Sequence, residues 1–302
     1  DLPPPRSRKP MTDAEPPSRA IPPARARPGI VGREFHLSSL PWWAIIIIAT
    51  GLTLAYLILA SPPYHDTFTF LSAGLIVTLR ITVSSYAIAT IIGLFTGLAR
   101  TSKNVIPYTV STLYVETVRG IPLIVLMLYM AFVVVPAVAN LLRVLGGWGY
   151  SAVGGSFFSN LSTIHSRDVS LELRAIVALG IGYGAYEAEI FRAGIQSIGR
   201  GQMEAARSLG MTYPQAMRHI ILPQAIRRVL PPLGNDFIAC LKDSSLATVL
   251  AVDELTQLGR LRRSSTFRVF ETFNVLSFLY LAMTLTLSAL VRGLERKMKF
   301  EE

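Results

Sequence analysis

Six long apolar runs dominate the chain and limit what it can fold into. A helix needs about 20 consecutive apolar residues to cross a bilayer, and runs of this kind occupy residues 42–60, 68–99, 104–136, 175–198, 223–250 and 273–291. Hydrophobic residues make up 51% of the sequence, and the mean hydropathy is +0.45. The sequence therefore predicts an all-α integral membrane protein with six transmembrane helices. The third run has a polar first half, and the fifth is expected to break near Pro231 and Pro232.

The first 40 residues have a different composition. Prolines alternate with arginines and lysines there, and such a segment cannot bury a core. We expect a disordered Pro/Arg-rich tail over residues 1–40, with Met11 as an alternative start. The net charge of +10 does not indicate nucleic-acid binding, because the arginines cluster at the ends of the apolar runs, where they determine topology. The single cysteine, Cys240, excludes an internal disulfide framework.

Orientation follows from the basic residues near the ends of the runs. The basic tail places the N-terminus in the cytosol, and six spans then place the C-terminus there too. The loop with Arg100 and Lys103 is inside in this topology, and residues 137–174 form an external insertion whose Trp148 and Tyr150 lie at the interface. One loop disagrees with the rule, because its arginines would lie outside: Arg260, Arg262, Arg263 and Arg268.

A polar and basic block lies between two of the apolar runs, at residues 199–222. Gln202 to Leu209 are mostly good helix formers, and Gly210 is a natural helix stop. The segment from Thr212 to Gln215 reads as a capping box with proline in the first turn. The block therefore predicts two short helices joined at a glycine and projecting from the membrane, with alanines small enough for the first helix to lie in a partner's groove.

This block matches the spacing EAA-x3-G-x9-I-x-LP and so resembles the inner-membrane permeases of ABC importers. The resemblance implies contact with an ATPase through the positions that match the motif: Glu204, Ala205, Ala206, Arg207, Gly210, Leu222 and Pro223. It also implies a five-helix permease core over residues 68–298 and an added N-terminal helix over 41–61. The implied location is a bacterial plasma membrane, the inner membrane in a Gram-negative cell.

Four further segments are similar to permeases for polar amino acids, the branch for histidine, glutamine, glutamate, arginine, cystine and opines. These segments are LIVTLRIT at residues 75–82, YVETVRGIPL at 114–123, YEAEIFRAGIQSI at 186–198 and LKDSSL at 241–246. With the signature, the resemblance covers about residues 70–298 without the 137–174 insertion. It implies a second permease chain (the same or a homologous one), two ATPase subunits, an extracytoplasmic substrate-binding protein and a polar amino acid as substrate.

Ionisable side chains inside the membrane are costly and usually functional. An amino acid carries a carboxylate and an ammonium, which a mid-depth cavity with both kinds of charge can hold. We expect the substrate path to be lined by Glu116, Arg119, Tyr186, Glu189 and Asn235. The alternative is that Glu116 with Arg119 forms a structural pair, and we expect such an intramembrane pair for Lys242 and Asp243.

No Gly-x4-Gly-Lys-Ser/Thr phosphate loop occurs in the sequence, so we expect ATP and magnesium to be bound by a partner ATPase and no cofactor by this chain. The four histidines show no metal-ligand spacing, and we expect no metal site. Three other classes stay open: an ion-gradient-driven secondary transporter, a channel for polar solutes, and a membrane enzyme. The first would need an inverted repeat with two broken helices, which the sequence does not clearly show. The identity of the amino acid and the choice between homodimer and heterodimer also stay open.

Overall fold

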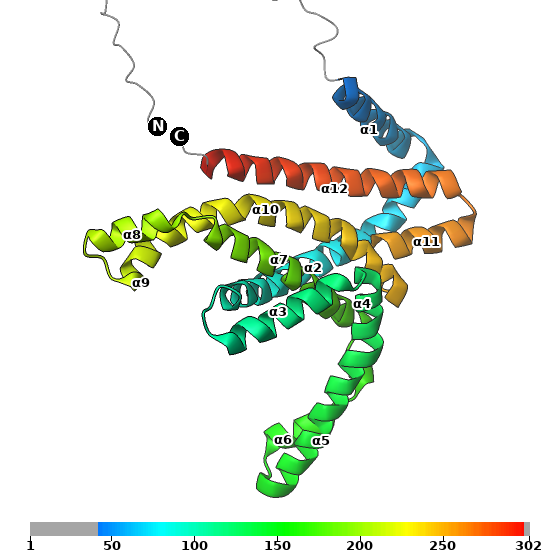
Figure 1. Ribbon diagram of the computed structural model, residues 1–302. Helices are drawn as coiled ribbons and strands as arrows, with labels where there is room; N and C mark the ends of the chain where they lie inside the picture. The colour runs from blue at the N-terminus through cyan, green and yellow to red at the C-terminus, as the bar shows by residue number, and fades with distance from the viewer. Residues whose placement is uncertain (1–41, 299–302) are drawn as a thin grey trace, which may run out of the picture. The chain divides into compact units, whose positions relative to one another are not determined.

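The computed structural model describes residues 42–298, and in this part of the chain every regular element is a helix (Figure 1). The predicted tail over residues 1–40 lies outside the described residues. The chain divides into two compact units, residues 1–46 and 47–302, and only the start of α1 is described in the first. The longer helices are α1 (Trp42–Ala60), α2 (Pro62–Ala99), α3 (Val105–Gly120), α5 (Val135–Val153), α7 (Leu171–Gln196), α10 (Leu222–Asp243), α11 (Leu255–Thr266) and α12 (Val269–Met298).

The centre of the second unit is the pair formed by α2 and α7. Glycines allow their backbones to approach closely, as at helix crossings in membranes. A Cβ atom added at Gly93 would lie 2.7 Å from the Cβ of Glu187, and one at Gly97 would lie 2.7 Å from the carbonyl oxygen of Ala188. The glycines of α2 therefore let the two helices pack closely. The helices α3, α4 (Leu123–Tyr129) and α10 pack around this pair.

Two expectations about helix continuity are wrong. The run at 104–136 is not one helix, because α3 ends at Gly120 and α4 begins at Leu123. Ile121 between them is extended, as is favoured for a residue before proline. In contrast, α10 does not break at Pro231 and Pro232, which both lie inside the helix.

Within residues 42–298 there are two π-helical turns, and each ends two residues before a proline. The first, η2 (Met130–Val134), joins α4 to α5, and the second, η4 (Met217–Ile221), joins α9 (Tyr213–Ala216) to α10. A proline has no N–H to donate and its ring crowds the preceding turn, so widening of that turn accommodates it. As a result α4, η2 and α5 form one continuous helical stretch, and so do α9, η4 and α10.

Four helical stretches of the described chain are long and apolar enough to cross a membrane: Trp42–Ala60, Pro62–Ala99, Leu123–Val153 and Val269–Arg296. The helices α7 and α10, which we also expected to span, carry too many charged residues to qualify by composition. The all-helical class is therefore confirmed, while six spans stay a prediction.

Candidate functional site

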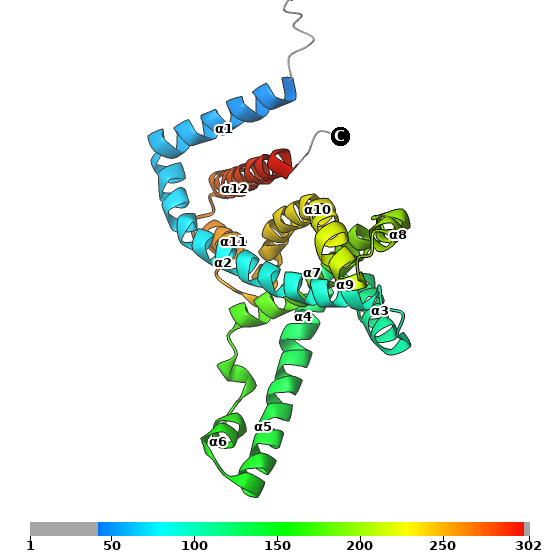
Figure 2. The same cartoon turned by 90° about the vertical axis from the view of Figure 1, so that its left-hand side faces the viewer.

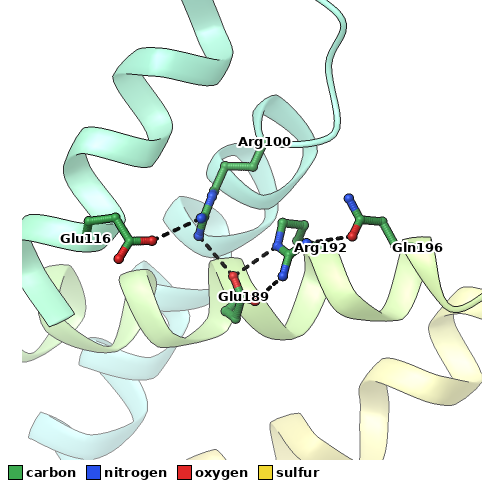
Figure 3. A network of polar contacts seen from close by, with 5 residues as sticks. All are labelled: Arg100, Glu116, Glu189, Arg192 and Gln196. Carbon is green, nitrogen blue, oxygen red and sulfur yellow. Dashed lines mark hydrogen bonds and ion pairs between the residues drawn. The ribbon is translucent and has the colours of Figure 1, made fainter.

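An arginine at the end of α2 connects three helices (Figure 3). Arg100 donates from Nη1 to Oε2 of Glu189 on α7 at 2.9 Å and from Nη2 to Oε1 of Glu116 on α3 at 3.1 Å. Its side chain is only 10% exposed, whereas that of Glu116 is 65% exposed. Two of the carboxylates predicted for the path are thus brought together by an arginine to which we had assigned only a topological role.

Glu189 has a second cationic partner one turn along its own helix. Arg192 donates to Glu189 through Nε at 3.0 Å and also through Nη2, and its Nη1 donates to Gln196 at 2.6 Å (Figure 3). Two guanidinium groups therefore occupy the Glu189 carboxylate. In this state it is not available to a substrate's ammonium group.

The remaining predicted path residues lie differently. The guanidinium carbon of Arg119 lies 5.6 Å from the centre of the Tyr186 ring, a cation–π distance, and the structure records no ion pair between Arg119 and Glu116. The ring of Tyr186 is 6.1 Å from that of Tyr183. Asn235 is exposed on α10, outside these contacts. The geometry thus joins Arg119 with Tyr186, and Glu116 with Glu189, as two separate groups.

Lys242 and Asp243 show no ion pair in the described part of the chain. Asp243 instead accepts a hydrogen bond from the hydroxyl of Tyr183 at 2.7 Å, and Lys242 is exposed. Neighbouring residues on a helix point about 100° apart, so adjacency in sequence does not bring two side chains together.

Two acids within the apolar runs were missed in the sequence. Glu187 on α7 is fully buried and Asp236 on α10 is half-buried, and neither oxygen of Glu187 nor Oδ2 of Asp236 has a hydrogen-bonding partner of normal geometry. An unmatched carboxylate inside a membrane protein is costly. Their presence in apolar runs was the available signal. The path prediction took the nearby Glu189 and the adjacent Asn235 instead.

A third acid, Glu254, is fully buried and directly precedes α11. Its carboxylate accepts from the backbone N–H groups of Thr256 at 2.9 Å and Gln257 at 2.7 Å, and so caps the helix. Burial raises the pKa of Glu254 to about 7, and the hydrogen bonds from these N–H groups and from Tyr280 oppose that rise.

The polar block folds largely as its sequence predicts. The first helix, α8 (Arg200–Ser208), is followed by Gly210 with a φ of 82°, and Thr212 forms the expected capping box with Gln215, its N–H donating to Oε1 at 2.9 Å. The second helix is not a separate short helix, because α9 continues through η4 into α10. Together α8 and α9 lie at one end of α7 and α10 (Figure 1).

The two faces of this block differ. Ala206 is buried and faces its own chain, where a small cluster that includes Ile198, Ile221 and Ala225 anchors the block. Glu204, Ala205 and Arg207 are exposed, without an ion pair between Glu204 and Arg207 in the structure. Two large apolar side chains are also exposed, Leu209 at 84% and Tyr213 at 55%. The block therefore presents an outer surface of mixed charge and apolar groups.

Comparison with known proteins places these features in a family. A family model described as the binding-protein-dependent transport system inner membrane component matches residues 89–300. The chain belongs to this family. The glutamine transport system permease protein GlnP of Escherichia coli (strain K12) is 36% identical over 226 residues, which cover 75% of this chain and 91% of that protein. The probable amino-acid permease protein YxeN of Bacillus subtilis (strain 168) is 34% identical over 231 residues, 76% of this chain and 92% of that protein.

A solved structure supports the same assignment. The crystal structure of an amino acid ABC transporter with histidines aligns with the permease at a TM-score of 0.61 and 35% identity, covering 76% of this chain and 94% of that one. The predicted family is thus confirmed, and the permease is a multi-pass inner-membrane subunit of an ABC importer. The family match includes the polar block at residues 199–222, which we call the signature block from here on, and α1 lies outside the match. It also includes the contacts of Arg100 with Glu116 and Glu189, which we call the Arg100 network.

Proposed function

We propose that this permease is the membrane subunit of an ATP-driven importer for polar amino acids, and that it couples to a separate ATPase through the signature block. The observation that carries the proposal is the outer surface of α8 and α9. Leu209 and Tyr213 expose apolar side chains on the same block as the exposed charges of Glu204 and Arg207, and protein interfaces combine groups of these two kinds. Leu222 and Pro223, which begin α10, are exposed as well and complete the matched positions.

The partners follow from this assignment. Two ATPase subunits bind ATP and magnesium and grip two signature blocks, one from each of two permease chains, and the permease itself holds no cofactor. An extracytoplasmic binding protein delivers the amino acid. Closure of the ATPase dimer moves the blocks and alternates access to the path between the two permeases. The permease crosses the membrane six times, with both termini in the cytoplasm.

We infer how the path opens from the contacts of Glu189. With Arg100 and Arg192 on its carboxylate, Glu189 is closed to substrate. Withdrawal of the Arg100 and Arg192 side chains from Glu189 would leave Glu116 and Glu189 to hold the ammonium of the amino acid. The guanidinium of Arg119, held over Tyr186, then receives the substrate's carboxylate. Asn235 of α10 completes the path. The glutamine permease and the amino-acid permease among the relatives support this substrate class.

The test is ATPase activity in vesicles that contain the permease, its co-expressed ATPase and binding protein loaded with single amino acids. We expect one amino acid to stimulate hydrolysis, and Glu204→Lys to abolish the stimulation. Asp66→Lys is the matched control, because it reverses an exposed acid at the start of α2, far along the chain from the block. If no ATPase co-purifies and ligand flux ignores ATP, coupling is refuted, and a gradient-driven carrier or channel explains the flux.

A further inference from the structure

The α5–α6 hairpin stands apart from the other helices of its unit. The helix α6 (Ser156–Ser162) packs back along α5 after a turn at Gly154 and Gly155, whose φ values are 71° and 97°. In both Figure 1 and Figure 2 this hairpin projects away from α2, α7, α10 and α12. In Figure 1, α5 runs across the direction of α12 rather than along it.

One face of α5 is filled by α6. A Cβ atom at Gly146 would lie 2.5 Å from the backbone nitrogen of Ser162, and the ring of Phe158 occupies the space beside Gly149. Ala139 on the same face is buried. This face has no room for another partner.

A second face of α5 is apolar and uncovered. Val138, Leu141, Leu145 and Trp148 follow one another at helical spacing and are 48%, 56%, 48% and 74% exposed. At 100° per residue these four side chains lie within a sector of about 80°. They form a continuous stripe, which we call the α5 stripe.

The face opposite the α5 stripe is polar. Arg143 donates to Asn140 at 2.9 Å, and both line a pocket of 260 Å³ together with His165 and Arg167. Buried Arg174 connects this pocket to the base of α5. It donates to the carbonyl of Ala131, which precedes α5, and to that of Ser166, which lines the pocket. The helix is therefore amphipathic, because the apolar Leu141 and the basic Arg143 lie about 160° apart around its axis.

Length does not decide the position of α5, because Leu123–Val153 has 31 residues and the candidate span Pro62–Ala99 has 38. The direction of α5 across α12 in Figure 1 argues against a span parallel to α12. An upright span would also carry Arg143 through the hydrocarbon. A helix with an apolar stripe that ends in tryptophan, and arginine on the opposite face, fits a position in the membrane surface.

We propose that α5 lies in the plane of the membrane interface, with the α5 stripe inserted among the lipid acyl chains of one leaflet and Arg143 facing the aqueous side. The identity of that leaflet, extracytoplasmic, rests on the proposed topology, whereas the contact with lipid does not. Tyr150, which we had expected at the interface with Trp148, is about 160° away from it around the helix and faces away from the acyl chains.

The test uses tryptophan fluorescence of the full chain. The sequence has three tryptophans, so Trp42→Phe with Trp43→Phe leaves Trp148 as the sole emitter without altering the hairpin. The protein is placed in vesicles of phosphatidylcholine and phosphatidylglycerol whose acyl chains are brominated near the headgroup or near the bilayer centre. We expect shallow bromines to quench Trp148 strongly, deep bromines to quench it less, and aqueous iodide to quench it little.

A matched variant moves the tryptophan to the other side of the helix. Trp148→Phe and Tyr150→Trp in the same background should give the reverse pattern, with iodide as the stronger quencher. Quenching of native Trp148 by iodide but not by bromolipid would overturn the proposal and place the stripe in water. Protection of Trp148 from both quenchers would also overturn it and would assign the stripe to a protein partner. Neither result depends on ATPase activity, so failure here is distinguishable from failure of the proposed function.

Discussion

Replacement of Arg100 with glutamine removes two ion pairs, which we expect to contribute unequally to the free energy of unfolding. The Arg100 side chain is 10% exposed, and its partners Glu189 and Glu116 are 29% and 65% exposed. A charge-assisted hydrogen bond shielded from water contributes about 1.5–3 kcal/mol, whereas an exposed ion pair contributes about 0–1 kcal/mol. We therefore expect a coupling energy of about 1.5 kcal/mol for Arg100 with Glu189, the lower end because Arg192 also binds Glu189. For Arg100 with Glu116 we expect less than about 0.5 kcal/mol.

Double-mutant cycles measure these two energies separately. The variants are Arg100→Gln, Glu189→Gln, Glu116→Gln and the two doubles, and the measurement is reversible unfolding by dodecyl sulfate in mixed micelles. Lys103→Gln is the matched control, because Lys103 is exposed three residues further along and has no partner in the Arg100 network. Its free energy of unfolding should equal that of the native protein within error.

The relative size of the two coupling energies tests whether burial determines the strength of each ion pair. A coupling with Glu116 that equals or exceeds the coupling with Glu189 would refute the reasoning from burial. A value near zero for both pairs would show that Arg100 does not link α2, α3 and α7 at all. The proposed opening of the path by release of Glu189 would then lose its structural basis.

Three further changes test other parts of the fold. Arg174→Met should lower the free energy of unfolding by about 3 kcal/mol, because three hydrogen bonds to backbone carbonyls are lost at a buried site; a loss below about 1 kcal/mol in detergent unfolding would contradict this. Glu254→Gln should remove a pH dependence. The raised pKa of about 7 means that the unfolded carboxyl ionises first, so the native protein loses up to about 3 kcal/mol as pH rises from about 4.5 to about 7, and equal pH profiles for variant and native protein would refute it. Pro223→Ala restores an N–H, so η4 should become α-helical and turn the signature block by about 100° relative to α10. Ligand-stimulated ATPase activity should fall while thermal stability does not, and unchanged stimulation would show that the π-turn has no role in coupling.

Much of the helical framework follows from the sequence, because long apolar runs and capping residues act locally. The end of α2 at Ala99, the stop at Gly210 and the Thr212 capping box needed no knowledge of the fold. The break at Ile121 was also available, since a residue before proline prefers an extended backbone. We missed it because hydropathy alone joined the polar and apolar halves of the run.

The site was less predictable, because its contacts join residues far apart in sequence. Arg100 and Glu189 are 89 residues apart, and only the α2–α7 crossing brings them together. The sequence instead favoured pairs within one helix, such as Glu116 with Arg119, since helical spacing is all that it displays. Likewise, burial of Glu187 depends on the glycine contact with α2, which composition cannot reveal.

Each of the two π-turns precedes a proline, but the two turns have different structural consequences. In η2 the N–H of Val135 donates to the carbonyl of Met130, and in η4 the N–H of Leu222 donates to the carbonyl of Met217; a proline follows immediately in each case. The carbonyl of Ala131 would need the N–H that Pro136 lacks, and buried Arg174 donates to it instead at 2.8 Å.

Proline alone does not produce this turn, since α10 continues as an α-helix through Pro231 and Pro232. At η2 the freed carbonyl recruits an arginine that fixes the base of the α5–α6 hairpin. At η4 the extra residue per turn sets the rotation between α10 and the signature block. The Leu-Pro pair that ends the signature therefore has a physical reason for its distance from Gly210, because the π-turn before it sets how α8 and α9 are rotated about α10. That rotation positions the exposed side chains of Glu204, Leu209 and Tyr213.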